Sequence, residues 1–156
     1  MGQPVADPLC NNQDAVKFVH GFQSEATDMA KQVSVPVEFI LGLAAEETQY
    51  GTGSIAIECN NYFSLHAPAP GQSGARPAKG DPKVLVAKFD SVHDSGASFI
   101  KKYGDSIKGA SDANDFAKRL IKARFNSGSG ADGGRADFVT YLVGIIRAVK
   151  VRMDCK

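Results

Sequence analysis

Two adjacent glutamates, Glu46 and Glu47, are the residues of this sequence best suited to acid chemistry. Residues three, four and seven apart share a face of a helix, so a helical wheel over residues 37–50 separates the two. Glu46 falls on one side with Gly42 and is interpreted as a solvated surface charge. Glu47 falls on the other side, in an apolar stripe with Leu43. Apolar neighbours disfavour a charged carboxyl group and raise its pKa toward the range that a general acid needs, so Glu47 is either a general acid or a helix-edge glutamate whose head reaches water.

The size and composition of the chain are those of one globular domain. Its 156 residues are expected to fold as a single unit, residues 1–156, with a real core. The net charge of +1 disfavours nucleic acid binding, and basic clusters at 118–124 and 147–152 are interpreted as solvated helix faces. No stretch approaches the ~20 apolar residues that a membrane span requires.

Three cysteines, Cys10, Cys59 and Cys155, leave two interpretations open. Either all three are reduced and buried, or one disulfide forms and one thiol remains. A structural zinc site is not expected, because no CxxC or HxxxH spacing accompanies them. Cys10 and Cys155 lie beside the two termini, which are often close in a compact domain, so a Cys10–Cys155 bridge is favoured. Such a bridge would suit an oxidising compartment.

The N-terminal residues 1–8 contain neither the basic region nor the apolar region of a signal peptide. Two explanations are open: the sequence is that of the mature form, or the protein leaves the cell by another route. The three histidines, His20, His66 and His93, have no mutual spacing that indicates a metal site.

Periodicity and capping residues predict a mainly helical chain. Helices are expected over about residues 12–31, 36–50, 91–103, 111–121 and 135–153, with caps at Asn11 or Asn12, at Ser91 and at Ser111. A glycine-rich loop is expected over residues 127–134.

The stretch between residues 54 and 90 predicts a small β lobe. Residues 55–57 and 61–66 are interpreted as short extended or irregular pieces, and residues 83–89 as a strand. Residues 67–82, rich in Pro, Gly, Ala and Ser, are interpreted as a flexible hairpin loop without regular structure. The expected fold class is α+β, mainly α: a lysozyme-like helical domain with a small β-hairpin lobe.

Two segments resemble motifs of the peptidoglycan glucosaminidases of glycoside hydrolase family 73. Residues 45–51 read Ala-Glu-Glu-Thr-Gln-Tyr-Gly, similar to the family pattern A-x-E-[ST]-x-[WY]-G. Residues 61–66 read Asn-Tyr-Phe-Ser-Leu-His, similar to N-[LY]-F-G-[IV]-K, with Ser64 and His66 in place of the usual Gly and Lys. Phe-Asp-Ser at 89–91 resembles the family's passage out of the β lobe. The resemblance extends over about residues 12–153.

The resemblance implies that Glu47 protonates the glycosidic oxygen of an N-acetylglucosaminyl bond in a peptidoglycan glycan strand. Tyr50 would line the sugar subsite, since an aromatic ring packs on a pyranose face, although core packing is an equal alternative. Asn61 would hold the backbone near Glu47 at the edge of the site. The other residues expected to contact substrate are Tyr62, His66, Asn126 and Tyr141. The reaction requires no cofactor or metal.

The second catalytic group is not defined by the resemblance. Asp81, in the predicted loop, is the candidate second carboxylate, and Asp90 and Glu58 are further possibilities. Either the loop brings Asp81 in on binding, or the substrate's N-acetyl oxygen attacks the anomeric carbon. Phe125 stands where the family usually has a tyrosine, so Asn126 or Tyr141 would substitute for it.

The segment that runs from Arg124-Phe125-Asn126 through Gly133-Gly134 to residues 149–153 and Cys155 resembles the antibacterial effectors of contractile, type VI, secretion systems. A compact glucosaminidase without wall-anchoring repeats agrees with such a toxin. This implies a secreted toxin that acts in the periplasm or cell wall of a target bacterium, and an immunity protein that occupies the substrate-binding groove of the toxin. A phage endolysin is the alternative biological role. The alternative activities are those of a lytic transglycosylase or a muramidase, and a third interpretation is a non-catalytic glycan-binding module with a buried structural Glu47.

Overall fold

A computed structural model describes residues 7–126, 128–129 and 135–156. A short 3-10 turn, η1 (Pro8–Asn11), precedes the helices α1 (Gln13–Val33), α2 (Val37–Thr48), α3 (Ser54–Cys59), α4 (Val92–Ile107), α5 (Ala113–Lys122) and α6 (Phe138–Met153). The strands β1 (Gly74–Pro77) and β2 (Leu85–Lys88) form an antiparallel pair between α3 and α4. The predicted α+β architecture, mainly helical with a β-hairpin lobe, is confirmed. The glycine-rich loop expected over residues 127–134 lies largely outside the described residues.

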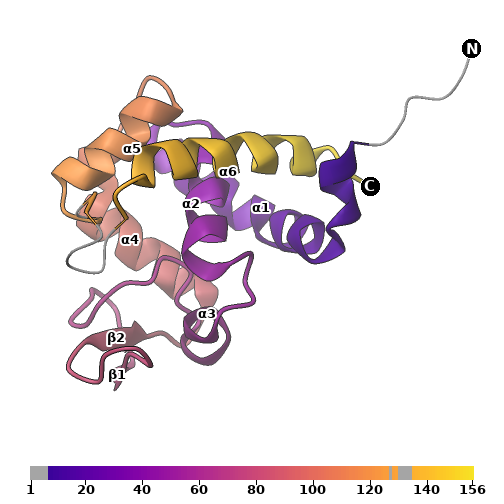
Figure 1. The fold of residues 1–156 in the computed structure, drawn as a ribbon. Helices are drawn as coiled ribbons and strands as arrows, with labels where there is room; N and C mark the ends of the chain where they lie inside the picture. Colours follow the sequence, from indigo (N-terminus) through magenta and orange to yellow (C-terminus); the bar gives the residue numbers. More distant parts are fainter. Residues whose placement is uncertain (1–6, 127, 130–134) are drawn as a thin grey trace, which may run out of the picture.

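Helix α2 runs through the centre of the domain, with α1 and α6 packed against it (Figure 1). Every residue from Phe39 to Ala45 is buried. Gly42 allows α6 to approach closely, because a Cβ atom there would lie 2.5 Å from Cγ1 of Ile146. The helical wheel, which left Gly42 on a solvated side, is wrong on this point: α2 is covered all round, so periodicity cannot define its exposed side.

Local capping residues set several helix starts. The Asn12 side chain accepts a hydrogen bond from the Ala15 amide, and the Ser91 hydroxyl accepts one from the Asp94 amide, as expected. Helix α5 is capped by Asp112 instead of Ser111, because the Asp112 carboxylate accepts the hydrogen bond at the third residue of the helix.

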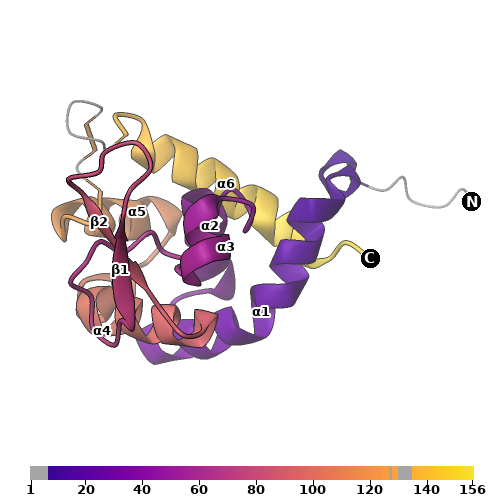
Figure 2. The same ribbon diagram turned by 90° about the horizontal axis from the view of Figure 1, so that it is seen from below.

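The β lobe differs from the prediction in two places. Residues 55–57 are helical, within α3, whose buried side chains Ala56 and Cys59 lie three residues apart and share a face. Residues 67–82 contain β1, which pairs along its whole length with β2, from Gly74 opposite Lys88 to Pro77 opposite Leu85. Proline at the end of an edge strand is compatible with this pairing. The strand expected within 83–89 is confirmed as β2. The hairpin lies at one end of the helical body, where β2 contacts α3 (Figure 2).

A disulfide bond joins Cys10 in η1 to Cys155 just after α6, with Cα atoms 5.7 Å apart. This is the pairing that the positions of the cysteines favour in the sequence. Cys59 is a free, buried thiol. Among the described residues, no helix combines the length and the apolar character that crossing a membrane requires.

Candidate active site

Glu47 lies in the last turn of α2, one residue before the helix ends at Thr48. Its side chain is only partly accessible to solvent. Burial raises the pKa of the Glu47 carboxyl well above its ordinary value, and the neighbouring Glu46 carboxyl raises it further through a hydrogen bond and like-charge repulsion. The direction of this shift agrees with the one expected from the apolar surroundings. A carboxyl group with a raised pKa keeps its proton at pH values where an ordinary glutamate has lost it, so it is able to donate that proton.

Glu46 is not the solvated surface charge predicted from the sequence. It is partly buried, and its Oε2 atom is inaccessible and has no hydrogen-bond partner among the described residues. The reason is that the helix is buried on every side from Phe39 to Ala45, which leaves no fully solvated face beside Glu47. Two carboxyl groups are therefore in contact in a partly desolvated position, and the arrangement favours a proton on Glu47.

The turn after Glu47 has an unusual backbone. Gln49, Tyr50 and Gly51 have φ angles of +48°, +55° and +79°, so three consecutive residues are left-handed. The Thr48 hydroxyl donates a hydrogen bond to the Ala44 carbonyl at 2.6 Å and accepts one from the Gly51 amide at 2.8 Å. This buried hydroxyl closes the turn and explains why Ser or Thr suits the position after the glutamate.

Gly51 is required by space as well as by backbone conformation. A Cβ atom at Gly51 would lie 2.7 Å from the Phe18 ring of α1. The positive φ angle of Gly51 also disfavours any residue with a side chain. The glycine that ends the first motif therefore lets the turn lie directly on α1.

The second motif is attached to the first through Ser64. The Ser64 hydroxyl donates a hydrogen bond to the backbone carbonyl of Glu47, with an oxygen–oxygen distance of 3.0 Å. Ser64 has a φ angle of +50°, a conformation that glycine adopts without strain, and this accounts for glycine in the family pattern. In this chain the serine accepts that backbone conformation and adds a direct bond to the glutamate.

Asn61 is completely buried, and its side chain is fully used inside the protein. Its amide group donates to the carbonyls of Leu65 and Ala87, and its oxygen accepts from the amides of Phe63 and Leu65. Asn61 therefore fixes the loop of the second motif against β2. The expectation that it also binds substrate is corrected, because no polar group of its side chain is free for a ligand.

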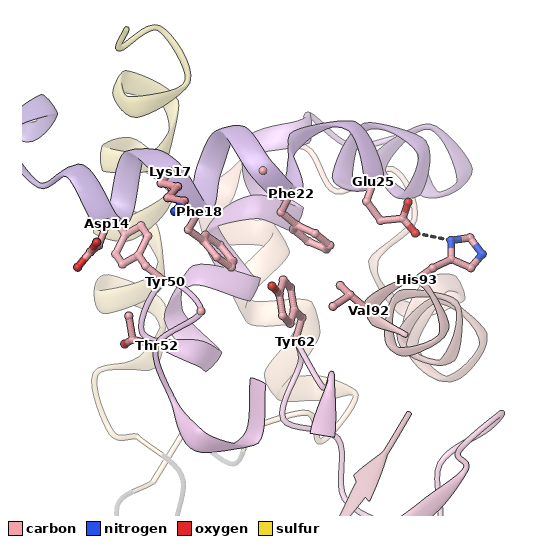
Figure 3. A pocket seen from close by; sticks show the side chains of 12 residues that line it. Asp14, Lys17, Phe18, Phe22, Glu25, Tyr50, Thr52, Tyr62, Val92 and His93 are labelled. Carbon is pink, nitrogen blue, oxygen red and sulfur yellow. Dashed lines mark hydrogen bonds and ion pairs between the residues drawn. The ribbon is translucent and has the colours of Figure 1, made fainter. Parts of the chain in front are cut away.

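A cavity of about 590 Å³ lies between α1 and the segments that carry the two motifs (Figure 3). Tyr50 and Tyr62 line it from one side, and Phe18 and Phe22 of α1 line it from the other. Burial raises the pKa of the Tyr62 hydroxyl. Glu47 is not among the residues that line this cavity.

The Tyr50 hydroxyl has a charged partner that the sequence did not indicate. Nη1 of Arg152 donates a hydrogen bond to it at 2.5 Å, and the guanidinium carbon lies 4.9 Å from the centre of the Tyr50 ring. Burial raises the pKa of Tyr50, and Arg152 opposes that rise. The cluster 147–152 is thus not wholly a solvated face, because Arg152 is buried. The spacing indicates the burial of Arg152 but not its partner: Arg152 continues the buried stripe of α6, three residues after Val149.

The other candidate residues occupy separate positions. Asp81 lies in the exposed turn between β1 and β2, where its carboxylate accepts a hydrogen bond from the Lys83 amide at 3.1 Å. No hydrogen bond or ion pair joins Asp81 to Glu47 in the part of the chain that the structure describes. His66 is exposed and pairs with Val86 in an isolated β-bridge.

Asn126 and Tyr141 lie on either side of the segment 127–134. The Asn126 oxygen accepts hydrogen bonds from the amides of Gly128 and Arg135, at 2.9 and 3.1 Å. Tyr141, on the first turn of α6, is exposed, and the Arg135 guanidinium stacks 3.7 Å from the centre of its ring. Among the described residues, no group of three or more His, Cys, Asp or Glu side chains could hold a metal ion.

Comparison with known proteins identifies the family. The sequence profile of the glucosaminidase family, described as mannosyl-glycoprotein endo-β-N-acetylglucosaminidase, matches residues 23–150. No curated protein shows significant sequence similarity to the chain.

Solved structures share the fold. A chain of a type VI secretion system effector–immunity complex from Pseudomonas protegens is 48% identical, with a TM-score of 0.86 over 96% of this chain and 100% of that chain. A peptidoglycan hydrolase from Sphingomonas sp. A1 is 19% identical, with a TM-score of 0.70 over 88% of this chain and 92% of that chain. The glycoside hydrolase domain of FlgJ from Salmonella typhimurium is 18% identical, with a TM-score of 0.62 over 87% of this chain and 88% of that chain. The chain therefore belongs to the glucosaminidase family and is a glycoside hydrolase of the endo-β-N-acetylglucosaminidase type.

Proposed function

We propose that this glycosidase cleaves the β-1,4 bonds of peptidoglycan glycan strands after N-acetylglucosamine, with Glu47 as the general acid. The observation that carries the proposal is the place of the Glu47 carboxyl, partly buried beside Glu46 at the end of the central helix, where these surroundings raise its pKa. Membership of the glucosaminidase family supports an N-acetylglucosaminyl bond as the bond that is cleaved. The similar structures from Sphingomonas and from Pseudomonas protegens support a bacterial cell-wall substrate over a mannosyl-glycoprotein.

In the proposed reaction, Glu47 donates its proton to the glycosidic oxygen as the bond to the anomeric carbon breaks. The proton leaves with the released sugar hydroxyl, and positive charge develops at the anomeric carbon. The hydrogen bond from Ser64 to the Glu47 carbonyl and the Thr48-closed turn hold the end of the helix during this step. The partial burial of Glu47 keeps the proton available at pH values where an ordinary glutamate would be ionised.

Two routes can stabilise the positive charge that develops at the anomeric carbon. Asp81 could act as the second carboxylate if the β1–β2 turn moves toward Glu47 when substrate binds. Alternatively, the N-acetyl oxygen of the substrate attacks the anomeric carbon, and water then opens the cyclic intermediate. Asp81 is exposed, and in the described part of the chain its side chain bonds within its own turn, which favours the second route. Under this route Asp81→Asn retains nearly full activity, whereas under the first it loses activity by two or more orders of magnitude, as is typical for a catalytic group.

Digestion of purified sacculi tests the activity. The wild type and Glu47→Gln are compared, with Glu38→Gln in the first turn of the same helix as the matched control, and the products are identified by mass spectrometry. Reducing N-acetylglucosamine ends are expected from the wild type and from Glu38→Gln, and none from Glu47→Gln. Products with 1,6-anhydromuramic ends or reducing muramic ends would indicate a transglycosylase or a muramidase instead. Undiminished digestion by Glu47→Gln would remove Glu47 from the mechanism.

We further propose that the enzyme is an antibacterial effector that acts in the periplasm of a target cell and is neutralised by a cognate immunity protein. The similarity to one chain of an effector–immunity complex, at 48% identity over nearly the whole of both chains, supports this role. The Cys10–Cys155 disulfide suits an oxidising compartment. The test is expression in a Gram-negative host with and without a periplasmic export signal. Lysis only on export, suppressed in Glu47→Gln, is expected; equal growth in all cases would contradict an effector role.

A further inference from the structure

We propose that Arg152 is a positioning residue for hydrolysis: it holds Tyr50, and with it the turn that follows Glu47, from an anchor that the Cys10–Cys155 disulfide fixes. The proposal rests on the proposed role of Glu47 and adds a residue 102 positions away from Tyr50 in sequence to the catalytic machinery. It is carried by the contacts of Arg152, the backbone of the turn and the place of the disulfide.

Arg152 is a buried charged residue whose hydrogen-bond partners are neutral. Only 7% of the residue is exposed. Its Nε donates to the Leu9 carbonyl at 3.1 Å, its Nη1 donates to the Tyr50 hydroxyl at 2.5 Å, and its Cζ lies 4.9 Å from the centre of the Tyr50 ring. No carboxylate in the described part of the chain forms an ion pair with it. Burying a guanidinium is unfavourable unless its donors are satisfied, so these two hydrogen bonds are what hold Arg152 in place, and Arg152 in turn holds its two partners.

Tyr50 needs to be held because of its backbone. It is the middle residue of the three left-handed residues after Thr48, and a non-glycine residue in that conformation persists only when its surroundings enforce it. Arg152 covers the ring and binds the hydroxyl, and Phe18 of α1 meets the ring edge-on, at 6.0 Å and 89°. Tyr50 is thus clamped between α1 and α6, with its ring toward the Asp14 end of the cavity (Figure 3). The clamp acts three residues from the proposed proton donor.

The disulfide fixes both sides of the Arg152 contact. Leu9 supplies the carbonyl that accepts from Arg152, and the next residue is Cys10. Cys155 follows Arg152 by three residues, and its amide donates to the Arg152 carbonyl at 3.2 Å. The bond between the two cysteines therefore keeps the acceptor and the guanidinium together, although they are far apart in the sequence. Without it, η1 would be joined to α6 by noncovalent contacts alone.

A double-mutant cycle tests the coupling between Arg152 and Tyr50. Arg152→Met removes the charge and both hydrogen bonds, and Tyr50→Phe removes only the hydroxyl. Each is expected to lower kcat for release of dye from labelled sacculi by roughly 10- to 100-fold, since a small misplacement of a catalytic group has an effect of this order. The half-saturating sacculus concentration should change little. The double variant should be no slower than the slower single variant.

Controls separate positioning from folding. Lys150→Met removes an exposed charge from the last turn of α6 and should leave kcat unchanged. Circular dichroism and Tm identify any variant that fails to fold. If Arg152→Met fails to fold, the activity of Tyr50→Phe, which retains Arg152, tests the positioning role by itself. Multiplicative losses in the double variant, or full activity in a folded Tyr50→Phe variant, would overturn the proposal.

A second double-mutant cycle tests the role of the disulfide. The Cys10→Ser/Cys155→Ser protein should lose several-fold in kcat in the wild-type background and lose nothing further in the Tyr50→Phe background. An equal loss in both backgrounds would show that the disulfide acts on the enzyme by another path and would overturn that part of the proposal. Failure here is distinguishable from failure of the proposed function. An active Glu47→Gln enzyme contradicts the latter, whereas an inactive Glu47→Gln enzyme with unimpaired Arg152 and Tyr50 variants contradicts only the positioning role.

Discussion

The Ser64 hydroxyl donates a hydrogen bond to the backbone carbonyl of Glu47 at 3.0 Å, and this bond joins the two sequence motifs of the chain. The first motif ends the central helix, and the second forms the loop that leads to the β lobe. Because the buried Asn61 fixes that loop from the inside, the bond ties the end of α2 to a rigid support. The proposed proton donor is thus held through its own backbone.

Ser64 variants separate the hydrogen bond from the backbone strain. Ser64→Ala loses the bond and keeps a side chain at φ +50°, so a loss of about 1 kcal/mol in the free energy of unfolding is expected. Ser64→Gly also loses the bond but adopts the positive φ angle freely, so it should be the more stable of the two. Urea denaturation measures both values. An alanine variant more stable than the glycine variant would contradict this account of the loop.

Glu46→Gln should move the alkaline limb of the pH–rate profile to lower pH. A general acid must be protonated, so the rate falls as pH rises through the pKa of Glu47. Removing the Glu46 charge lowers that pKa, but burial, its largest cause, remains, so the limb should stay above the ordinary range of a glutamate. Initial rates between pH 4 and 9 measure the shift, with Glu38→Gln as the control that leaves the limb in place. A limb that moves upward would exclude this coupling.

The raised pKa of Glu47 also predicts how stability depends on pH. A carboxyl with a higher pKa in the folded state than in the unfolded state stabilises the protein fully below the unfolded value, about 4.3. That contribution is lost as pH rises from the unfolded pKa through the folded pKa, because in this range the unfolded chain gives up its proton while the folded state keeps it. The difference in unfolding free energy between wild type and Glu47→Gln, which does not titrate, should therefore decline from pH 4 upward and then level off. A difference that grows with pH would show a lowered pKa.

Gly42 should tolerate no larger residue, because α6 lies against it. In Gly42→Ala the new Cβ would meet Ile146 at 2.5 Å and its Cα at 3.0 Å, which predicts a loss of about 1–3 kcal/mol from overpacking. Gly144→Ala on α6 is the matched control, since nothing lies within 4 Å of its Cβ position. It should gain up to about 1 kcal/mol from helix propensity. Thermal unfolding measures the Tm of both variants. Equal shifts of Tm in the two variants would contradict the packing of α2 on α6.

Local signals predicted the local structure well. The N-caps Asn12 and Ser91 can be predicted from the sequence, because each cap and the amide that it binds lie three residues apart. The strand β2 is readable from its branched residues, whereas its partner β1 is not. Strand β1 is held by pairing with β2 rather than by its own composition, Gly-Ala-Arg-Pro.

The candidate site was predictable only in part, for the same reason. Glu47 stands out by its apolar surroundings, but the wheel failed for Glu46 because α2 is enclosed on every side by other elements. Arg152 and Ser64 act on the turn after Glu47 from distances of 102 and 17 residues in the sequence. Contacts of this kind depend on tertiary packing, which no local pattern encodes.

The most direct test of Glu47 as a proton donor uses leaving groups of different acidity. Glu47→Ala is assayed on sacculi and on a dinitrophenyl β-glycoside of an N-acetylglucosamine oligomer, whose leaving group needs no protonation. We predict a loss of roughly 100-fold or more on sacculi, with the aryl glycoside cleaved at a rate near that of the wild type. Equal losses on both substrates, or no loss on sacculi, would contradict the role of Glu47 as the general acid.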